Sequence, residues 1–285
     1  MRRCQPIGLF DSGVGGFTVA QEIFRQLPHE EILYYADTAH VPYGPRSVEE
    51  LIRFATEITT FLVSQGAKMI LVACNTSSSL ALQILQERFH VPIVGVVDPG
   101  AQEAVKTTRN GRVGVLATEA TIRKGAHGMR IQELDSSIQV YGQACPLYVP
   151  LVESGKYLSK EAEEASRLYL EPLMKASVDT IILGCTHYPY LEPSIRKIIG
   201  DAVHLIDPAR QTVAQGKYLI ENGIVPARDS RYGKPHHHFY VSGDLQSFRQ
   251  VGGPLIGAPI LQDLRQVSLD GILDGVAPQL ISATA

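Results

Sequence analysis

The feature that most constrains the fold is a pair of short apolar runs, each ending at a cysteine that polar residues follow. They are residues 70–77, Ile-Leu-Val-Ala-Cys-Asn-Thr-Ser, and residues 181–188, Ile-Ile-Leu-Gly-Cys-Thr-His-Tyr. Apolar runs of this length without alternation predict strands buried on both faces, as in a parallel sheet covered by helices. Ligands of such sheets bind beyond the carboxyl ends of the strands, so Cys74 and Cys185 are predicted to stand at a functional site.

The two runs belong to an internal repeat. Helix-like segments at residues 50–65 and 161–176 precede them, strand-like residues 7–10 match residues 113–116, and residues 96–99 match residues 205–208. The repeat predicts an α/β fold with two pseudo-symmetric domains, each a mainly parallel sheet flanked by helices, and a cleft between them with one thiol on either side. We expect residues 1–98 and 208–285 to form the first domain, which carries Cys74, and residues 99–207 the second, which carries Cys185.

A simpler interpretation of the two cysteines is core packing, because free cysteine is among the most buried residue types. Their matching places in a repeat, each before polar residues, favour a functional role. The other cysteines are Cys4 and Cys145, and no C-x-x-C pair occurs, which argues against a structural zinc site. Strand alternation puts only two rings of the His triplet at residues 236–238 on one face, so no metal site is expected.

Composition limits the classes of partner. A length of 285 residues suits two domains, and 45% apolar residues are typical of a globular protein. A net charge of −3 gives no case for binding nucleic acid or an anionic membrane. No stretch approaches the roughly 20 apolar residues of a membrane span, and no apolar run of signal-peptide length precedes Asp11. We therefore expect a cytoplasmic protein whose thiols stay reduced.

The loop after the first strand, Asp-Ser-Gly-Val-Gly-Gly at residues 11–16, is a candidate binding loop. Glycines let a backbone approach a ligand closely, and a helix start offers unpaired N–H groups to an anion. A dinucleotide fingerprint would need a third glycine where Thr18 stands, so a carboxylate ligand fits as well as a phosphate. Asp11 at the strand end has the alternative role of capping the next helix.

Three more loops carry candidate residues. Tyr43 and Gly44 follow the second predicted strand, residues 31–37, and precede a capping box at residues 47–50. Thr118 and Thr121 stand where the repeat places the counterpart of the Asp11 loop, and they can cap a helix or donate to a carboxylate. Glu153 lies in a predicted loop at residues 151–155. Turn formation, capping and solvation are the simpler alternatives for these residues.

Five stretches together resemble the cofactor-independent aspartate/glutamate racemase superfamily, and within it the glutamate racemases. They are residues 10–16, 37–44 (Asp-Thr through Pro-Tyr-Gly), 73–76 (Ala-Cys-Asn-Thr), 151–153 (Leu-Val-Glu) and 184–189 (Gly-Cys-Thr-His-Tyr-Pro). The resemblance implies two domains with the active site between them, Cys74 and Cys185 as acid/base thiols, and Asp11, Glu153 and His187 as their assistants. It implies substrate contacts from Asp11, Ser12, Tyr43, Gly44, Asn75, Thr76, Thr186 and His187.

The activity that the resemblance implies is interconversion of L-glutamate and D-glutamate, which supplies D-glutamate for bacterial peptidoglycan; it also admits a homodimer. Two opposed thiols can take a proton from one face of the α-carbon and return one to the other, since the ordinary thiol pKa of about 8.5 lies near neutrality. We expect no pyridoxal phosphate, nucleotide or metal cofactor. Donors from Asn75, Thr76 and Thr186 would then stabilise carbanion charge that passes into the substrate carboxylate.

Other interpretations stay open at this point. Charge alone does not separate a glutamate racemase from an aspartate or other amino-acid racemase of the superfamily. A Cys–His acyl-transfer enzyme would use Cys185 as nucleophile and His187 as base, but it leaves Cys74 and the repeat unexplained. A small-ligand binding protein without chemistry would use the same cleft.

Overall fold

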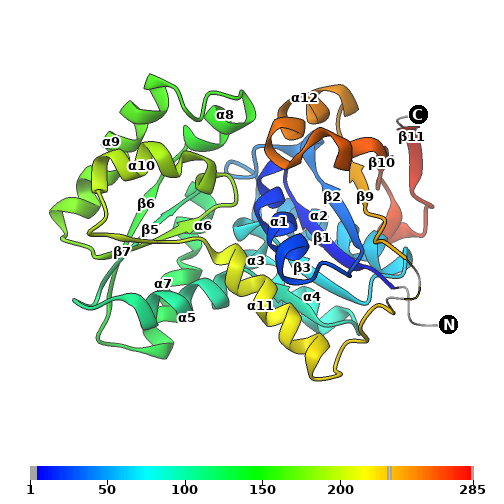
Figure 1. Ribbon diagram of the computed structural model, residues 1–285, viewed down its shortest axis with the longest axis horizontal. Coiled ribbons are helices and arrows are strands. Elements are labelled where there is room, and N and C mark those ends of the chain that lie inside the picture. Colours follow the sequence, from blue (N-terminus) through cyan, green and yellow to red (C-terminus); the bar gives the residue numbers. More distant parts are fainter. Residues whose placement is uncertain (1–4, 230, 232, 284–285) are drawn as a thin grey trace.

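The computed structural model describes residues 5–229, 231 and 233–283, and within them the strands form two sheets in separate lobes (Figure 1). The larger sheet runs parallel throughout, except that its edge strand β11 is antiparallel to β10. In sheet order its strands are β11 (Gln279–Ala283), β10 (Leu264–Ser268), β9 (His238–Val241), β2 (Ile32–Ala36), β1 (Ile7–Asp11), β3 (Met69–Val72) and β4 (Ile93–Gly95).

The smaller sheet is parallel throughout and repeats part of the larger one. Its order, β6-β5-β7-β8, matches the order β2-β1-β3-β4. Its strands are β6 (Gln139–Ala144), β5 (Arg112–Ala117), β7 (Thr180–Gly184) and β8 (His204–Ile206). β3 and β7 hold the same place in the two sheets, and both are buried along their whole length. The α/β fold with two pseudo-symmetric parallel sheets, predicted from the repeat, is confirmed.

Helices cover both faces of each sheet. Around the larger sheet they are α1 (Phe17–Gln26), α2 (Val48–Ser64), α3 (Asn75–Leu80), α4 (Leu82–Arg88), α11 (Pro208–Glu221) and α12 (Leu245–Ile256). Around the smaller sheet they are α5 (Val97–Thr107), α6 (Glu119–Lys124), α7 (Ala126–Leu134), α8 (Tyr148–Glu153), α9 (Lys160–Lys175) and α10 (Glu192–Ile199). Short 3-10 turns are η1 (Val14–Gly16), η2 (Thr38–His40), η3 (Tyr188–Leu191), η5 (Ala258–Gln262) and η6 (Ile272–Asp274).

Local sequence explains where α2 forms. Ser47 and Glu50 make the predicted capping box, in which each side chain bonds the backbone N–H of the other residue. Leu51, Phe54 and Ile58 then recur at helical spacing and are buried. Leu51 and Phe54 pack with residues at the strand ends, and Ile58 packs against the sheet. The cap and the apolar stripe together fix the start and the orientation of α2. The loop before α2 therefore lies at the carboxyl end of β2.

The chain crosses between the lobes through two helices. α5 follows the last strand of the first unit but packs on α7 and β7, whereas α11 follows β8 and packs on α1 and β4. Figure 1 shows α11 reaching from the smaller lobe to the larger one. From there the tail adds β9 beside β2. The domain boundaries after residues 98 and 207 stay a prediction. Within the described residues, no helix is both long and apolar enough to cross a membrane.

The structure differs from four local interpretations of the sequence: one helix over residues 77–89, a strand that ends at Asp98, a loop at residues 151–155 and a strand that contains Cys145. The helix expected over residues 77–89 is two helices, broken at Ala81, and Asp98 lies in the first turn of α5 instead of at a strand end. Residues 151–153 are helical: Tyr148 and Val152, one turn apart, are buried together, and Pro150 suits a first turn. Cys145 lies just past β6, not inside it. For the Gly- and Pro-rich tail we drew no element from the sequence, and it contains the strands β10 and β11.

Candidate active site

A cavity of about 210 Å³ lies at the carboxyl ends of strands from both sheets. It is several times larger than the roughly 10–15 Å³ that one water needs, so a small molecule can enter it. Ten of its lining residues were predicted as site residues: Ser12, Tyr43, Gly44, Cys74, Asn75, Thr76, Thr118, Cys185, Thr186 and His187. The remaining three, Asp11, Glu153 and Thr121, do not line the cavity but contact residues that do.

Cys74 is the thiol on the larger sheet's side of the cavity. It caps α3, where its Sγ accepts a hydrogen bond from the backbone N–H of Ser77 at 3.5 Å. Only 5% of the residue is exposed. Burial raises the pKa of the Cys74 thiol to about 12, and the charge of Asp11 adds to that rise. Cys74 is therefore protonated at neutral pH and is suited to donate a proton.

Cys185 on the opposite side has different neighbours. It follows β7, and its Sγ lies 3.7 Å from Nδ1 of His187, whose Nε2 lies 2.7 Å from Oε1 of Glu153. Burial would lower the pKa of His187, but its hydrogen bonds with Cys185 and Glu153 outweigh burial and hold the pKa well above its ordinary value. A protonated ring donates from both nitrogens. Its Nδ1–H then faces a sulfur that is suited, as a thiolate, to accept a proton.

Glu153 completes this line from the end of α8. Burial would raise the pKa of its carboxyl, but the hydrogen bond and the charge of His187 hold that pKa below its ordinary range. The two shifts agree in direction, because each charged partner favours the other. Glu153 is thus an ion-pair partner of His187 instead of the solvated carboxylate that was the simpler alternative.

Asp11 is fully buried and bonds across the two sheets. Its Oδ2 accepts a hydrogen bond from Oγ1 of Thr186 at 2.9 Å, and its Oδ1 accepts one from the backbone N–H of Gly13 at 3.1 Å. Burial raises the pKa of Asp11, although the charge of His187 and these two hydrogen bonds work against burial. The role near Cys74 that we inferred for Asp11 from the sequence stays a prediction, and the charge of Asp11 does raise the pKa of that thiol. Its hydrogen bonds join Asp11 to the segment that carries Cys185.

Two glycines of the loop after β1 lie against side chains of the smaller lobe. A Cβ on Gly13 would lie 2.5 Å from Oε1 of Glu153, and one on Gly15 would lie 2.4 Å from Oγ1 of Thr186. Real Cβ atoms do not approach so closely, so these glycines make room for side chains of the smaller lobe. The loop admits the Glu153–His187 pair and Thr186, and its approach to a ligand stays a prediction.

Three threonine hydroxyls meet at the other side of the cavity. Oγ1 of Thr76 lies 3.1 Å from that of Thr118 and 3.2 Å from that of Thr121. Thr118 also caps α6 by accepting from the backbone N–H of Thr121. Thr118 therefore has two roles: it caps α6, which was the simpler alternative, and it contacts Thr76 of the other lobe. Next to Thr76, the buried Oδ1 of Asn75 has no hydrogen-bond partner within the described chain, and a ligand's donor would satisfy it.

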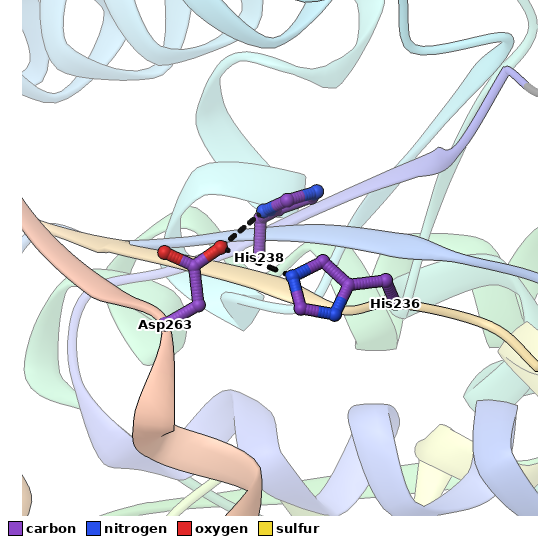
Figure 2. A group of neighbouring side chains, drawn as sticks. All are labelled: His236, His238 and Asp263. Atoms are coloured by element: carbon purple, nitrogen blue, oxygen red, sulfur yellow. Dashed lines mark hydrogen bonds and ion pairs between the residues drawn. The ribbon is translucent and has the colours of Figure 1, made fainter.

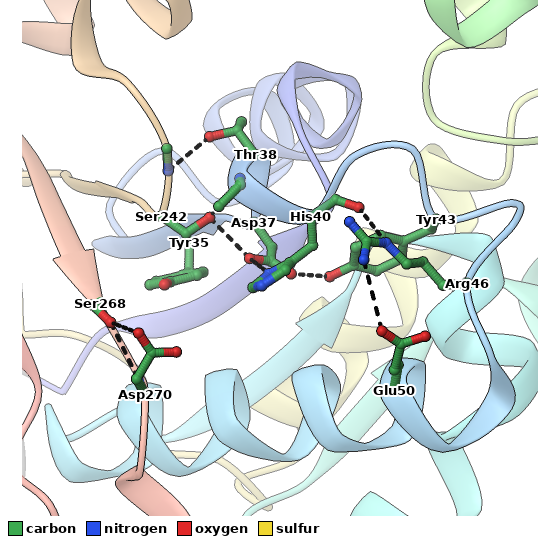
Figure 3. A network of polar contacts seen from close by, with 12 residues as sticks. Tyr35, Asp37, Thr38, His40, Tyr43, Arg46, Glu50, Ser242, Ser268 and Asp270 are labelled. Atoms are coloured by element: carbon green, nitrogen blue, oxygen red, sulfur yellow. Dashed lines mark hydrogen bonds and ion pairs between the residues drawn. The ribbon is translucent and has the colours of Figure 1, made fainter.

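Two residues of the site were not predicted: Asp37, which lies behind the cavity wall, and Cys145, which lines the cavity. Tyr43 donates a 2.6 Å hydrogen bond to Oδ2 of the buried Asp37, whose Oδ1 accepts from Ser242 and lies 2.7 Å from Nδ1 of His40 (Figure 3). Asp37 thus fixes the ring of Tyr43 at the cavity wall. Cys145 also lines the cavity, and burial raises the pKa of its thiol. Both residues directly follow paired strands, β2 and β6, so the strand-end rule that found Cys74 could have found them.

Comparison with known proteins shows which family this chain belongs to. A family model described as Asp/Glu/Hydantoin racemase matches residues 12–216. A glutamate racemase of Desulforudis audaxviator is 46% identical over 255 residues, which cover 88% of this chain and 93% of that protein. A glutamate racemase isoform from Bacillus anthracis superposes with a TM-score of 0.84 at 40% identity, covering 90% and 95% of the two chains. The enzyme of Francisella tularensis, solved with D-glutamate, has a TM-score of 0.86 at 35% identity, covering 94% and 99%.

Proposed function

Because the chain belongs to the Asp/Glu/hydantoin racemase family, we propose that Cys74 and Cys185 interconvert L-glutamate and D-glutamate by proton transfer at opposite faces of the α-carbon. The enzyme is an isomerase and a glutamate racemase. The observation that carries the mechanism is that two thiols, one from each sheet, line the same cavity in unequal surroundings. One faces a protonated imidazole, and the other is held protonated by burial.

The reaction from L-glutamate begins at Cys185. Its thiolate removes the α-proton, and the electron pair of the broken C–H bond passes into the substrate carboxylate. The Cys74 thiol then donates its proton to the opposite face of the carbon, which leaves Cys185 as thiol and Cys74 as thiolate. From D-glutamate the two cysteines exchange roles. No electron is gained or lost, and the resemblance to the family is what assigns Cys185 to L-glutamate.

Polar groups of the cavity have separate tasks in this proposal. Asn75, Thr76 and Thr186 would donate hydrogen bonds to the substrate carboxylate, where charge accumulates in the transition state. Ser12, Tyr43 and Gly44 would contact the substrate from the larger lobe and Thr118 from the smaller one, with Thr121 holding the hydroxyls of Thr76 and Thr118 from behind. His187, held by Glu153, would keep its proton close to Cys185 and so stabilise the thiolate.

The setting of the enzyme follows from the same premise. The ligand would be glutamate, as in the Francisella tularensis structure solved with D-glutamate, and the assembly a homodimer. We place the enzyme in the cytoplasm, where reduced thiols persist, and its D-glutamate product in peptidoglycan synthesis. The reaction would need no pyridoxal phosphate, nucleotide or metal.

The Cys185–His187–Glu153 line also resembles the arrangement of an acyl-transfer enzyme. That chemistry gives Cys74 no role and is not the activity of the family. One experiment separates the alternatives: incubation with L-glutamate in heavy water, followed by optical rotation and by deuterium content at the α-carbon. We expect loss of rotation with one deuterium gained per inversion. Covalent acylation of Cys185, or binding without turnover, would contradict the proposal.

A further inference from the structure

Two histidines of the triplet share one face of a strand. His238 begins β9 and His236 lies two residues before it, and their rings lie side by side. Their ring centroids are 4.7 Å apart. His237 points the other way and stacks on Phe24, with ring centroids 4.6 Å apart. The sequence predicted that two of the three rings share one face. Two ligands were too few to predict a metal site from the triplet alone.

A carboxylate from a distant part of the chain joins them. Asp263 lies just before β10, which pairs with β9, and its carbonyl accepts a hydrogen bond from the N–H of Phe239. Its Oδ2 lies 2.6 Å from Nδ1 of His238 and 3.3 Å from Nε2 of His236. Figure 2 shows the two rings and the carboxylate converging. The three donor atoms all lie within 4.8 Å of one another.

Arg265 holds the carboxylate of Asp263 from the side away from the two rings. Nε of Arg265 donates to Oδ1 at 2.9 Å, and its Nη2 makes a longer contact of 3.3 Å with Oδ2. The guanidinium therefore orients the carboxylate so that Oδ2 faces the rings, as partners behind a metal ligand commonly do. The side chain of His236 is 69% exposed, which leaves the group open to ions from solvent.

We propose that His236, His238 and Asp263 bind one divalent first-row transition-metal ion such as Zn²⁺. Two imidazoles and a carboxylate form a donor set that suits such ions and not Ca²⁺ or Mg²⁺, which prefer oxygen ligands. Donors at about 2.0–2.2 Å from a tetrahedral zinc lie a little over 3 Å apart. Small side-chain rotations bring the three atoms to that spacing, and water completes the coordination.

The site is structural and separate from catalysis. His238 begins β9 and Asp263 precedes β10, whereas the catalytic cavity lies at the carboxyl ends of the same parallel sheet. Neither residue lines that cavity. A bound ion would tie β9 to the segment before β10, which otherwise touch here through hydrogen bonds and ion pairs. It would thereby stabilise the added strands without changing turnover.

The test titrates Zn²⁺ into the full chain by calorimetry. The parent carries Cys74→Ser and Cys185→Ser, because thiols of the active site would themselves bind zinc. We expect one Zn²⁺ per chain, with affinity lowered at least about tenfold by His236→Ala or Asp263→Asn, as losses around metal sites typically are. If Asp263→Asn disturbs folding, His236→Ala still tests the site, because the side chain of His236 is exposed and its loss leaves the fold intact.

The matched control is His237→Phe, which keeps the stack on Phe24 and should bind zinc like the parent. Thermal unfolding provides a second readout. Zn²⁺ should raise the midpoint of the parent and of His237→Phe but not of His236→Ala, because an ion that binds only the folded state stabilises it. Binding only at millimolar zinc, equal binding by all variants, or an unchanged midpoint in the parent would overturn the proposal.

Discussion

Thr186 donates a hydrogen bond from its Oγ1 to Oδ2 of Asp11 at 2.9 Å, and this bond joins the ends of β1 and β7 across the two lobes. Asp11 is the last residue of β1 in the larger sheet, and Thr186 follows Cys185 at the end of β7 in the smaller one. The bond sets the distance between the walls of the cavity from within the protein. Both residues are buried, so water does not compete for it.

Replacing either catalytic thiol by a hydroxyl should abolish racemisation. Cys74→Ser and Cys185→Ser change the volume little, but a hydroxyl has a far higher pKa and cannot serve as the base. We expect kcat to fall by about 10²–10⁴-fold, the usual contribution of general acid–base catalysis. Initial rates from both enantiomers measure the effect. Near-normal turnover in either folded variant would rule out the two-thiol mechanism.

Glu153→Gln should move the alkaline limit of activity to lower pH. The carboxylate helps to raise the pKa of His187, so the variant loses the ring's proton at lower pH. The pKa of His187 is higher in the folded state than its ordinary value of about 6.5. The protonated ring therefore contributes its full stabilisation of the folded state below about pH 6.5, and this contribution is lost as the pH rises through the folded-state pKa.

Glu153→Gln should therefore destabilise the protein most at and below about pH 6.5, as long as Glu153 is ionised in the parent. We expect a loss of about 1.5–3 kcal/mol in the free energy of unfolding, the usual contribution of a hydrogen bond between charged groups. Denaturant unfolding at several pH values and a profile of kcat/KM against pH measure both effects. The matched control is Glu164→Gln, at an exposed position of α9. An alkaline limit that stays in place would remove Glu153 from the tuning of His187.

His187→Asn should affect the two directions unequally. His187 contacts Cys185, and Thr76 stands at the matching place after Cys74. If the ring tunes only the second thiol, kcat should fall more from L-glutamate than from D-glutamate. The equilibrium constant between enantiomers cannot change, so kcat/KM must fall equally in both directions and KM must compensate. Wild-type kinetics with lowered stability would instead mean that the ring only packs.

Gly15→Ala should inactivate the enzyme through steric contact. The added Cβ would lie 2.4 Å from Oγ1 of Thr186 and 2.5 Å from Nδ1 of His187, and both atoms would have to move away from Cys185 and Asp11. We expect a fall in kcat of about a hundredfold, as a displacement of about 1 Å can cause. Gly253→Ala is the control, since its nearest atom would be 3.8 Å away. Equal activity of the two variants would contradict this account of the loop.

Chelation should leave turnover unchanged. The catalytic proposal uses only thiols, imidazole, carboxylates and hydroxyls, and the proposed zinc ligands lie at the opposite end of the sheet. Exhaustive treatment with a chelator, followed by initial rates and thermal unfolding, should lower at most the unfolding midpoint. A loss of activity that one metal restores would contradict the metal-free mechanism.

Local patterns in the sequence determined the strands and the places where chemistry was to be sought. The run before Cys74 is buried on both faces as predicted, because an unalternating apolar run has no face to give to water. The repeat predicted the matching strand before Cys185 and the paired sheets, because equal patterns bury equal surfaces. The predicted capping box at Ser47 is present in the structure, because its hydrogen bonds join residues only three positions apart and so depend on local sequence alone.

Tertiary structure decided which of these groups work together. Glu153 reaches His187 because α8 folds over the cavity, although residues 151–155 alone predicted a loop. The glycines at 13 and 15 proved necessary for side chains of the other lobe, which no local pattern describes. Asp263 joins His236 and His238 only because β9 and β10 pair in parallel register. In each case the contact links segments far apart along the chain, and its distance is set by how sheets and helices pack.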